Sequence, residues 1–330
     1  MIVGLVGFAV SSCRKKIDFE EAQNVSQSGP IDPSQPILKE WEYVGLITGV
    51  KNAASDGNLI YYNRYYNGIN RMYSLDPSGI ITYLFDISTN DDVKVLKYQG
   101  GKLYFAQRES NGVGKIHEFN ETGILNSYTI NVSLSYGTDI FEILDVGTEL
   151  FVAGRFRFAN NGSSWSTCLI DKATGTITEM PGLGSNPIKS ATVYNNEIHI
   201  VGRTIFGNYN SSSGQCLARW DGSQWVAMGT TTIQSNLYVP PNATAIGVHN
   251  GELFVGGGLT SYPRGMYQYN STSNNFVGQQ AFVSSVSNTE FVDVVMEQID
   301  NKLYAFGDLR FSNSSFNSVF VLENDGWRSI

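Results

Sequence analysis

The stretch "NGELFVGGGLTSYPRGMYQYNSTSNNFVGQ", residues 250–279, shows the unit from which the fold is built. It opens with Asn250-Gly251, a pair that tolerates the positive φ of a tight hairpin turn. An apolar run "ELFVGGG" follows, then a Tyr-bearing run "MYQY", a polar turn and a final aromatic residue. This order indicates short antiparallel strands joined by turns.

The same unit occurs six times from about residue 46 onward. Each copy spans roughly 44 to 55 residues and contains a second hairpin, so it holds four strands. The first turns of the six copies are Asp56-Gly57, Gly100-Gly101, Gly147-Thr148, Asn195-Asn196, Asn250-Gly251 and Asp300-Asn301. A lone four-stranded unit cannot bury both its faces and must stack on its neighbours. The sequence therefore predicts an all-β, six-bladed β-propeller with four antiparallel strands per blade.

One further strand precedes the six copies. "WEYVG" at 41–45 resembles "WVAMG" at 225–229, the last strand of the fourth copy. We expect this N-terminal strand to meet the last blade and help close the ring, which would cover an exposed sheet edge.

The unit at 250–279 resembles the repeat of kelch-type propellers, with its apolar strand, Gly pair, Tyr-bearing strand, turn and aromatic. The sixth copy, "KLYAFG…VFVLENDGWRSI", places Trp327 at the aromatic position. The double Gly occurs in the fifth copy, whereas copies three, four and six keep one Gly at this place. The resemblance implies a propeller scaffold and does not name a ligand, because one scaffold hosts many functions.

The N-terminus resembles a bacterial lipoprotein signal. Residues 1–12, "MIVGLVGFAVSS", are apolar or small and too few to span a bilayer, and Val10-Ser11-Ser12-Cys13 resembles a lipobox. The resemblance implies that Cys13 becomes the lipidated first residue. The acidic run "DFEE" at 18–21 further resembles surface lipoproteins of the Bacteroidota. The competing interpretation is a frayed N-terminal strand with a buried Cys.

These observations divide the chain into three parts. Residues 1–12 are a predicted signal peptide, 13–40 a lipidated Cys with a flexible tether, and 41–330 a single propeller domain. The expected location is the outer membrane or cell surface through the lipid anchor, with a periplasm-facing orientation and an upstream start codon left open.

Charge and cysteine content restrict the partners. The formal net charge of −8 argues against nucleic acid, and we expect no cofactor and a monomeric domain. His117, His199 and His249 show no metal-ligand spacing. Cys168 and Cys216 are predicted to point to the same side of neighbouring sheets with a sheet between them, which predicts two buried free thiols.

An arginine recurs at one position of the repeat. Counting five residues beyond the first apolar residue of each second strand gives Arg64, Arg108, Arg155, Arg203, Gly258 and Asp308. These residues are expected at the rim of the ring face that carries the longer loops, together with the aromatic residues Trp165, Tyr209 and Tyr238. Guanidinium groups in such an array can bind carboxylates, sulfates or phosphates. Alternatively, each Arg pairs with an acid or a carbonyl of the adjacent blade.

Three functions remain open at this point. The leading hypothesis is a non-catalytic, lipid-anchored propeller that binds a glycan or protein ligand through the loop-rich face. The first alternative is a glycan-active hydrolase or lyase whose arginine cluster holds an acidic sugar; the acids Glu109, Asp86, Asp91, Asp92 and Asp308 lie near that face, but their spacing defines no catalytic pair. The second alternative is a structural module of a surface assembly.

Overall fold

The computed structural model describes residues 50–88, 92–109, 112–130, 139–156, 166–183, 188–206, 215–228, 242–258, 265–281, 294–299, 302–307, 319–323 and 326–329. Within these residues no helix is long and apolar enough to cross a membrane. The predicted signal peptide, Cys13, the tether and the strand at 41–45 lie outside the described residues.

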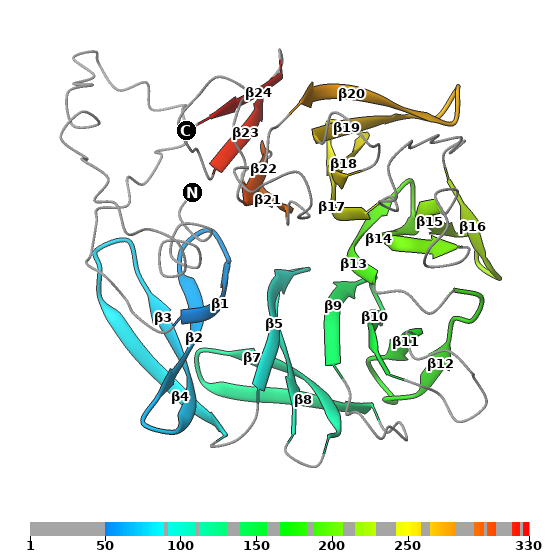
Figure 1. The fold of residues 1–330 in the computed structure, drawn as a ribbon. Coiled ribbons are helices and arrows are strands. Elements are labelled where there is room, and N and C mark those ends of the chain that lie inside the picture. The colour runs from blue at the N-terminus through cyan, green and yellow to red at the C-terminus, as the bar shows by residue number, and fades with distance from the viewer. Residues whose placement is uncertain are drawn as a thin grey trace, which may run out of the picture.

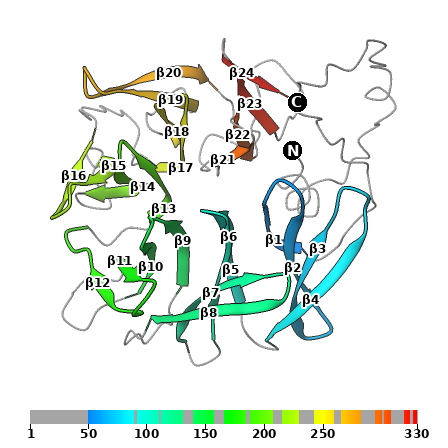
Figure 2. The same ribbon diagram turned by 180° about the vertical axis from the view of Figure 1, so that it is seen from behind.

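Six four-stranded antiparallel units form a ring, which Figure 1 and Figure 2 show from its two sides. The fourth and fifth units are joined into one eight-stranded sheet by a single pairing, of Arg203 with Asn242. Blade one contains β1 (Val50–Ser55), β2 (Ile60–Tyr66), β3 (Ile69–Leu75) and β4 (Ile81–Ser88). Blade two contains β5 (Asp92–Gln99), β6 (Lys102–Arg108), β7 (Gly114–Asn120) and β8 (Gly123–Ile130). Blade three contains β9 (Asp139–Asp145), β10 (Glu149–Arg155), β11 (Ser166–Asp171) and β12 (Ile177–Glu179).

The other three blades repeat the order. Blade four contains β13 (Ile188–Tyr194), β14 (Glu197–Phe206), β15 (Gln215–Trp220) and β16 (Trp225–Ala227). Blade five contains β17 (Asn242–His249), β18 (Glu252–Gly258), β19 (Gly265–Asn270) and β20 (Asn275–Ala281). Blade six contains β21 (Val294–Ile299), β22 (Lys302–Gly307), β23 (Val319–Glu323) and β24 (Gly326–Ser329).

The first strand of each blade lies nearest the centre of the ring and the fourth lies at the periphery (Figure 1). Consecutive first strands contact one another from β1 through to β21. The six-bladed all-β architecture predicted from the repeats is therefore confirmed. Blade six takes its four strands from residues 294–329, and the ring-closing role of residues 41–45 stays a prediction because those residues are not described.

The predicted two-residue turn between the first and second strands is confirmed in blades two, four and five and is wrong in blades one and three. Both residues of the pairs Gly100-Gly101, Asn195-Asn196 and Asn250-Gly251 have positive φ, which is the backbone of a two-residue type I′ hairpin. In blades one and three the turn is longer, and only Gly57 and Gly147 have positive φ. Asp300-Asn301 lies outside the described residues.

The turn between the third and fourth strands is held by an Asp or Asn side chain in blades one to five, the blades in which the structure describes this turn. The oxygen Oδ1 of this residue accepts hydrogen bonds from backbone N–H groups two to four residues later. The five residues are Asp76, Asn120, Asp171, Asp221 and Asn270. Such side chains mimic a backbone turn and fix the hairpin.

The first strand of blades one to five contains a β-bulge. In blade three, for example, Ile140 pairs with Gly154 and Glu142 pairs with Ala153, so Phe141 has no place in the ladder. The five extra residues are Lys51, Lys94, Phe141, Lys189 and Thr244. Blade six pairs β21 with β22 without a register shift.

The bulge explains an unexpected spacing of core residues. Ile140 and Ile143 both pack in the cluster between blades two and three, although residues three apart in a regular strand point to opposite faces. Ile188 and Ala191 in blade four show the same spacing. The bulge inserts one residue between them and restores the side chains on both sides of it to a common face.

The core lies between the blades. Apolar clusters join blades one and two, two and three, three and four, four and five, and five and six. Fully buried Tyr104 of blade two, for instance, packs with Val152 and Phe156 of blade three. A sixth cluster, of Ile60, Tyr62 and Leu75, lies within blade one. The other five clusters bury sheet faces between neighbouring blades, so these blades stabilise one another.

Cys168 and Cys216 are buried free thiols, as predicted, but the predicted geometry is wrong. Cys168 packs between blades two and three, whereas Cys216 packs between blades four and five, so the two thiols face away from each other. The reason is a register shift between Val201 and Phe206 in the pairing of β14 with β15, which breaks the alternation on which the prediction depends.

Candidate functional site

The four repeated arginines lie at equivalent places near the ends of the second strands of blades one to four. Arg108 and Arg155 are the last residues of β6 and β10, Arg64 lies two residues before the end of β2, and Arg203 lies within the longer β14. In blades one to three the first strand begins opposite the arginine: Val50 pairs with Arg64, Asp92 with Arg108 and Asp139 with Arg155. In blade four the first strand begins opposite Gly202, and Arg203 pairs with Asn242 of blade five. The predicted register is therefore correct.

Arg108 and Arg155 converge on one carboxylate, that of Asp139. Arg108 Nη1 lies 3.0 Å from Asp139 Oδ1, and Arg155 Nη2 donates to Asp139 Oδ2. Lys94 Nζ lies 3.8 Å from Asp139 Oδ1. Arg155 belongs to the same blade as Asp139, whereas Arg108 and Lys94 come from blade two. The carboxylate therefore joins two blades at the ring face where the second strands end.

The charges in this group do not balance. Among the side chains that the structure describes, three cations surround one carboxylate, so positive charge is in excess within this group, in a protein of net charge −8. The side chain of Asp92, which pairs with Arg108 in the ladder, is not described. The side chain of Asp139 is 7% exposed, but those of Lys94, Arg108 and Arg155 are 27%, 36% and 38% exposed. The buried anion holds the cations in place, and the cations reach water. We call Lys94, Arg108, Asp139 and Arg155 the seam cluster.

Gly154 makes this geometry possible. A Cβ on Gly154 would lie 2.2 Å from the carbonyl oxygen of Asp139 and 3.0 Å from Cα of Ile140. A residue with a side chain would therefore push β9 away from β10 at the bulge, next to Arg155. The "AGR" at the end of β10 thus encodes both a close backbone approach and the position of the guanidinium.

The other predicted site residues are placed only in part. Arg64 is partly exposed and has interaction partners, and no ligand role follows from its position alone. The structure describes the backbone of Arg203 but not its side chain. Asp308, Trp165, Tyr209 and Tyr238 lie outside the described residues, so whether they join the arginines stays untested.

Sequence reasoning missed Asp139, although a signal was present. In blades two and three an Asp stands sixteen residues before the Arg, as the pairs Asp92/Arg108 and Asp139/Arg155 show. That spacing is the length of one hairpin, and it places the two residues opposite each other across the first and second strands. The contact of Asp139 with the preceding blade has no such signal.

The loop lengths on this face differ from expectation in blade one. The connection between β2 and β3 is the two-residue turn Asn67-Gly68, with positive φ at both residues. Tyr65, beside this turn, is 49% exposed. The corresponding connections of blades three and four are longer, in agreement with the prediction.

Two of the acids considered for catalysis form ion pairs, and the side chains of the other three are not described by the structure. Glu109 pairs with Lys115, and Asp86 Oδ1 accepts a hydrogen bond from Arg71 Nε at 3.0 Å on the outer strands of blade one. Asp91 and Asp308 lie outside the described residues, and the side chain of Asp92 is not described.

The three histidines are all buried. His117 Nδ1 lies 2.7 Å from Ser127 Oγ, and burial lowers the pKa of His199 despite a hydrogen bond to the carbonyl of Glu197. Across the residues that the structure describes, no group of His, Cys, Asp and Glu is arranged to hold a metal ion.

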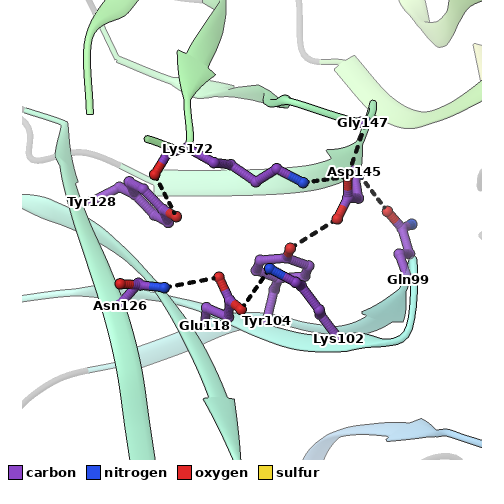
Figure 3. A network of polar contacts seen from close by, with 9 residues as sticks. All are labelled: Gln99, Lys102, Tyr104, Glu118, Asn126, Tyr128, Asp145, Gly147 and Lys172. Carbon is purple, nitrogen blue, oxygen red and sulfur yellow. Dashed lines mark hydrogen bonds and ion pairs between the residues drawn. The ribbon is translucent and has the colours of Figure 1, made fainter. Parts of the chain in front are cut away.

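A second polar network lies at the opposite side of the blade two and three junction, where the tight turns are (Figure 3). Asp145 Oδ2 accepts a hydrogen bond from Tyr104 Oη at 2.8 Å, and Asp145 Oδ1 lies 2.8 Å from Lys172 Nζ. Burial alone would raise the pKa of Asp145, but these partners and the Gly147 N–H lower it below its ordinary value. Nearby, Lys102 Nζ lies 2.8 Å from Glu118 Oε1. Here the charges balance within the network, so it serves to join the blades.

No protein-family model and no curated protein sequence matches this chain. Its fold does match solved structures. The β-propeller domain of the Trilobed protease from Pyrococcus furiosus superposes with a TM-score of 0.56 at 10% sequence identity, over 86% of this chain and 81% of that one. A chain of a mitotic checkpoint complex gives a TM-score of 0.52 at 11% identity, over 84% and 78%.

The acylaminoacyl peptidase of Pyrococcus horikoshii also matches, with a TM-score of 0.57 at 9% identity. The match covers 86% of this chain but 45% of the peptidase, so the similarity spans less than half of that protein. At these identities the similarity shows the fold alone: the chain folds as a β-propeller that resembles the propeller domains of peptidases and of other assemblies.

Proposed function

We propose that this protein is a non-catalytic propeller that binds a glycan or protein ligand through the ring face on which the seam cluster lies. The observation that supports the proposal is the excess of positive charge around Asp139. An arginine that served only to neutralise a buried acid would need no second and third cation. A local field opposite in sign to the net charge attracts and orients an anionic ligand.

Each of the two guanidinium groups has N–H donors that do not contact Asp139. Arg108 contacts Asp139 through Nη1 and Arg155 through Nη2, whereas a guanidinium carries five N–H donors. Arg155 Nε is buried and is not one of the donors that a ligand can reach. More than a third of each side chain is exposed, so other N–H groups of Arg108 and Arg155 can donate to a ligand carboxylate, sulfate or phosphate.

The test is a binding screen with matched variants. Wild type and Arg108→Gln/Arg155→Gln are applied to a glycan array and to pull-downs with proteins of the same membrane. Arg219→Gln is the control, since Arg219 Nη1 contacts Glu197 Oε1 at 2.6 Å in a comparable, partly exposed ion pair at the opposite end of the blades. We expect the double variant to lose ligand and the control to keep it; equal binding by both variants contradicts the proposal.

A second variant separates the effect of the positive charge of Arg155 from the effect of its guanidinium geometry. Arg155→Lys keeps the cation beside Asp139 but removes the fork of parallel donors. We expect it to fold with near wild-type stability and to bind ligand more weakly. Wild-type affinity in Arg155→Lys would show that only charge matters at this position.

We propose that the protein is located at the outer membrane or cell surface through a lipid on Cys13. We also propose that its repeats are of the kelch type. The lipobox-like Val10–Cys13 and the apolar run before it support this location, and the repeat at 250–279 supports the kelch-type assignment. Cys13→Ala should move the protein from the membrane fraction to the soluble fraction. Unchanged fractionation would refute the anchor.

A further inference from the structure

The β-bulges of the first strands place one extra residue per blade at equivalent positions. In blades two to five the bulge falls at the same step of the ladder, and in blade one it falls one residue nearer the start of the strand. The extra residue has no Cα partner in the register with the second strand, and the described strands β21 and β22 of blade six pair without such a residue. The ladder therefore does not require these residues.

Three consecutive blades present a cation, an aromatic ring and a cation at this position. Blade two has Lys94, blade three has Phe141 and blade four has Lys189. Phe141 is 39% exposed, which is unusual for a Phe flanked by buried Ile140 and Glu142. Lys189 is also exposed and makes no ion pair with a described residue, and Lys94 reaches Asp139 in the seam cluster.

The position of these residues follows from the ring. β5, β9 and β13 are the innermost strands of their blades, and consecutive ones contact each other (Figure 1). Both faces of each sheet are covered by the neighbouring blades. An exposed side chain on an innermost strand therefore lies toward the ring axis, near the end of the strand where Asp139 and the two arginines lie.

We propose that Lys94, Phe141 and Lys189 form a subsite for an acidic polysaccharide at the axial end of the ring, beside Arg108 and Arg155. The anionic groups of the glycan contact the lysines and arginines, and one sugar ring places its apolar C–H face on Phe141. The inference rests on the proposed function, and it specifies the class of ligand.

The arrangement favours a polysaccharide over an acidic peptide. An acidic polysaccharide carries its charged groups on rigid sugar rings, so one chain can present anionic groups to Lys94 and Lys189 and a ring face to Phe141 between them. An acidic peptide would have to order one flexible side chain for each cation, and each such side chain loses conformational entropy on binding. The charged group can be a carboxylate or a sulfate, because both accept hydrogen bonds from Lys and Arg.

The test measures binding of defined polymers at low salt by isothermal titration calorimetry. The probes are a polyuronate, a sulfated polysaccharide, a neutral polysaccharide and polyglutamate, the first two of which separate carboxylate from sulfate. We expect wild type to bind at least one of the first two and to bind neither the neutral polymer nor polyglutamate with similar affinity. The affinity should fall as salt is raised.

The variants are Lys94→Gln/Lys189→Gln, Phe141→Leu and the control Lys302→Gln, an exposed lysine at the start of β22 at the opposite end of its blade. We expect the double lysine variant to lose about tenfold or more in affinity, equivalent to about 1.4 kcal/mol. Phe141→Leu should lose severalfold, since it keeps apolar volume but not the ring. The control should bind like wild type. Thermal denaturation confirms that each variant folds.

The outcomes distinguish this inference from the proposed function. If a protein partner binds and depends on Arg108 and Arg155, but no acidic glycan binds, the inference is wrong and the proposed function stands. Equal binding of the neutral polymer or of polyglutamate, or wild-type affinity in the double lysine variant, also overturns the inference. If no ligand of any kind depends on the seam cluster, both fail.

Discussion

Asp139→Asn tests whether the seam cluster stabilises the fold as well as the site. The substitution preserves size and removes one negative charge that is nearly buried and lies within 4 Å of Arg108, Arg155 and Lys94. Removing one partner of a buried ion pair costs about 3 to 5 kcal/mol. Here the three cations are 27% to 38% exposed, so water solvates them when the anion is lost.

We therefore expect Asp139→Asn to lower the free energy of unfolding by about 2 to 3 kcal/mol, below the fully buried range. The assay is urea denaturation followed by tryptophan fluorescence, which Trp225 supports because it is buried between blades three and four. The control is Asp86→Asn, which breaks an exposed pair with Arg71 and should cost less than about 1 kcal/mol.

A double-mutant cycle locates the source of the loss. Asp139→Asn and Arg155→Gln should be non-additive, with a coupling energy on the order of 1 kcal/mol, because each removes the same contact. Equal losses in Asp139→Asn and Asp86→Asn, or strict additivity in the cycle, would refute the idea that one buried carboxylate holds the cluster together.

Three further predictions concern the backbone, the turns and the thiols. Gly154→Ala should lower the free energy of unfolding by about 2 kcal/mol or more and weaken ligand binding, because the new Cβ would lie 2.2 Å from the Asp139 carbonyl oxygen. Gly147→Ala is the control: the space around Gly147 is open, but its φ is +88°. In urea denaturation this control should cost about 1 kcal/mol, and it should leave binding intact. Backbone N–H donors from Gln224 and Ser223 lower the pKa of Asp221 to about 2. The carboxylate therefore contributes its full stability above the ordinary pKa of 3.8, and this contribution is lost as pH falls toward 2. Acid denaturation of Asp221→Asn should lack this component; a profile identical to wild type would show that the Asp221 carboxylate does not stabilise the turn. Burial raises the pKa of Cys216 to about 12, and Cys168 is equally buried, so neither thiol should react with a thiol reagent at neutral pH until urea unfolds the protein; rapid labelling of the native state would contradict their burial.

The repeats predict the fold because propeller blades depend on local signals. The pairs Gly100-Gly101 and Asn250-Gly251 fix tight hairpins through positive φ, and each hairpin sets the register of its two strands. The equivalence of Arg108 and Arg155 follows from the same counting, since both lie a fixed number of residues beyond a turn.

The contacts between blades could not be predicted in this way. Asp139 binds Arg108 across 31 residues of sequence, and the bulge at Phe141 shifts the alternation from which side-chain direction is derived. The opposite directions of Cys168 and Cys216 have a similar cause, a register shift inside blade four. Local pattern determines each blade, whereas the junctions depend on how neighbouring sheets approach one another.

The bulges have a consequence for how such a ring can change over evolutionary time. The side chain at this position differs between blades while the ladder on either side of it is kept, as Lys94, Phe141 and Thr244 illustrate. Gene duplication copies the position together with the blade. Each copy can then acquire its own side chain, so a propeller of this kind can alter its ligand preference one blade at a time while its architecture stays the same.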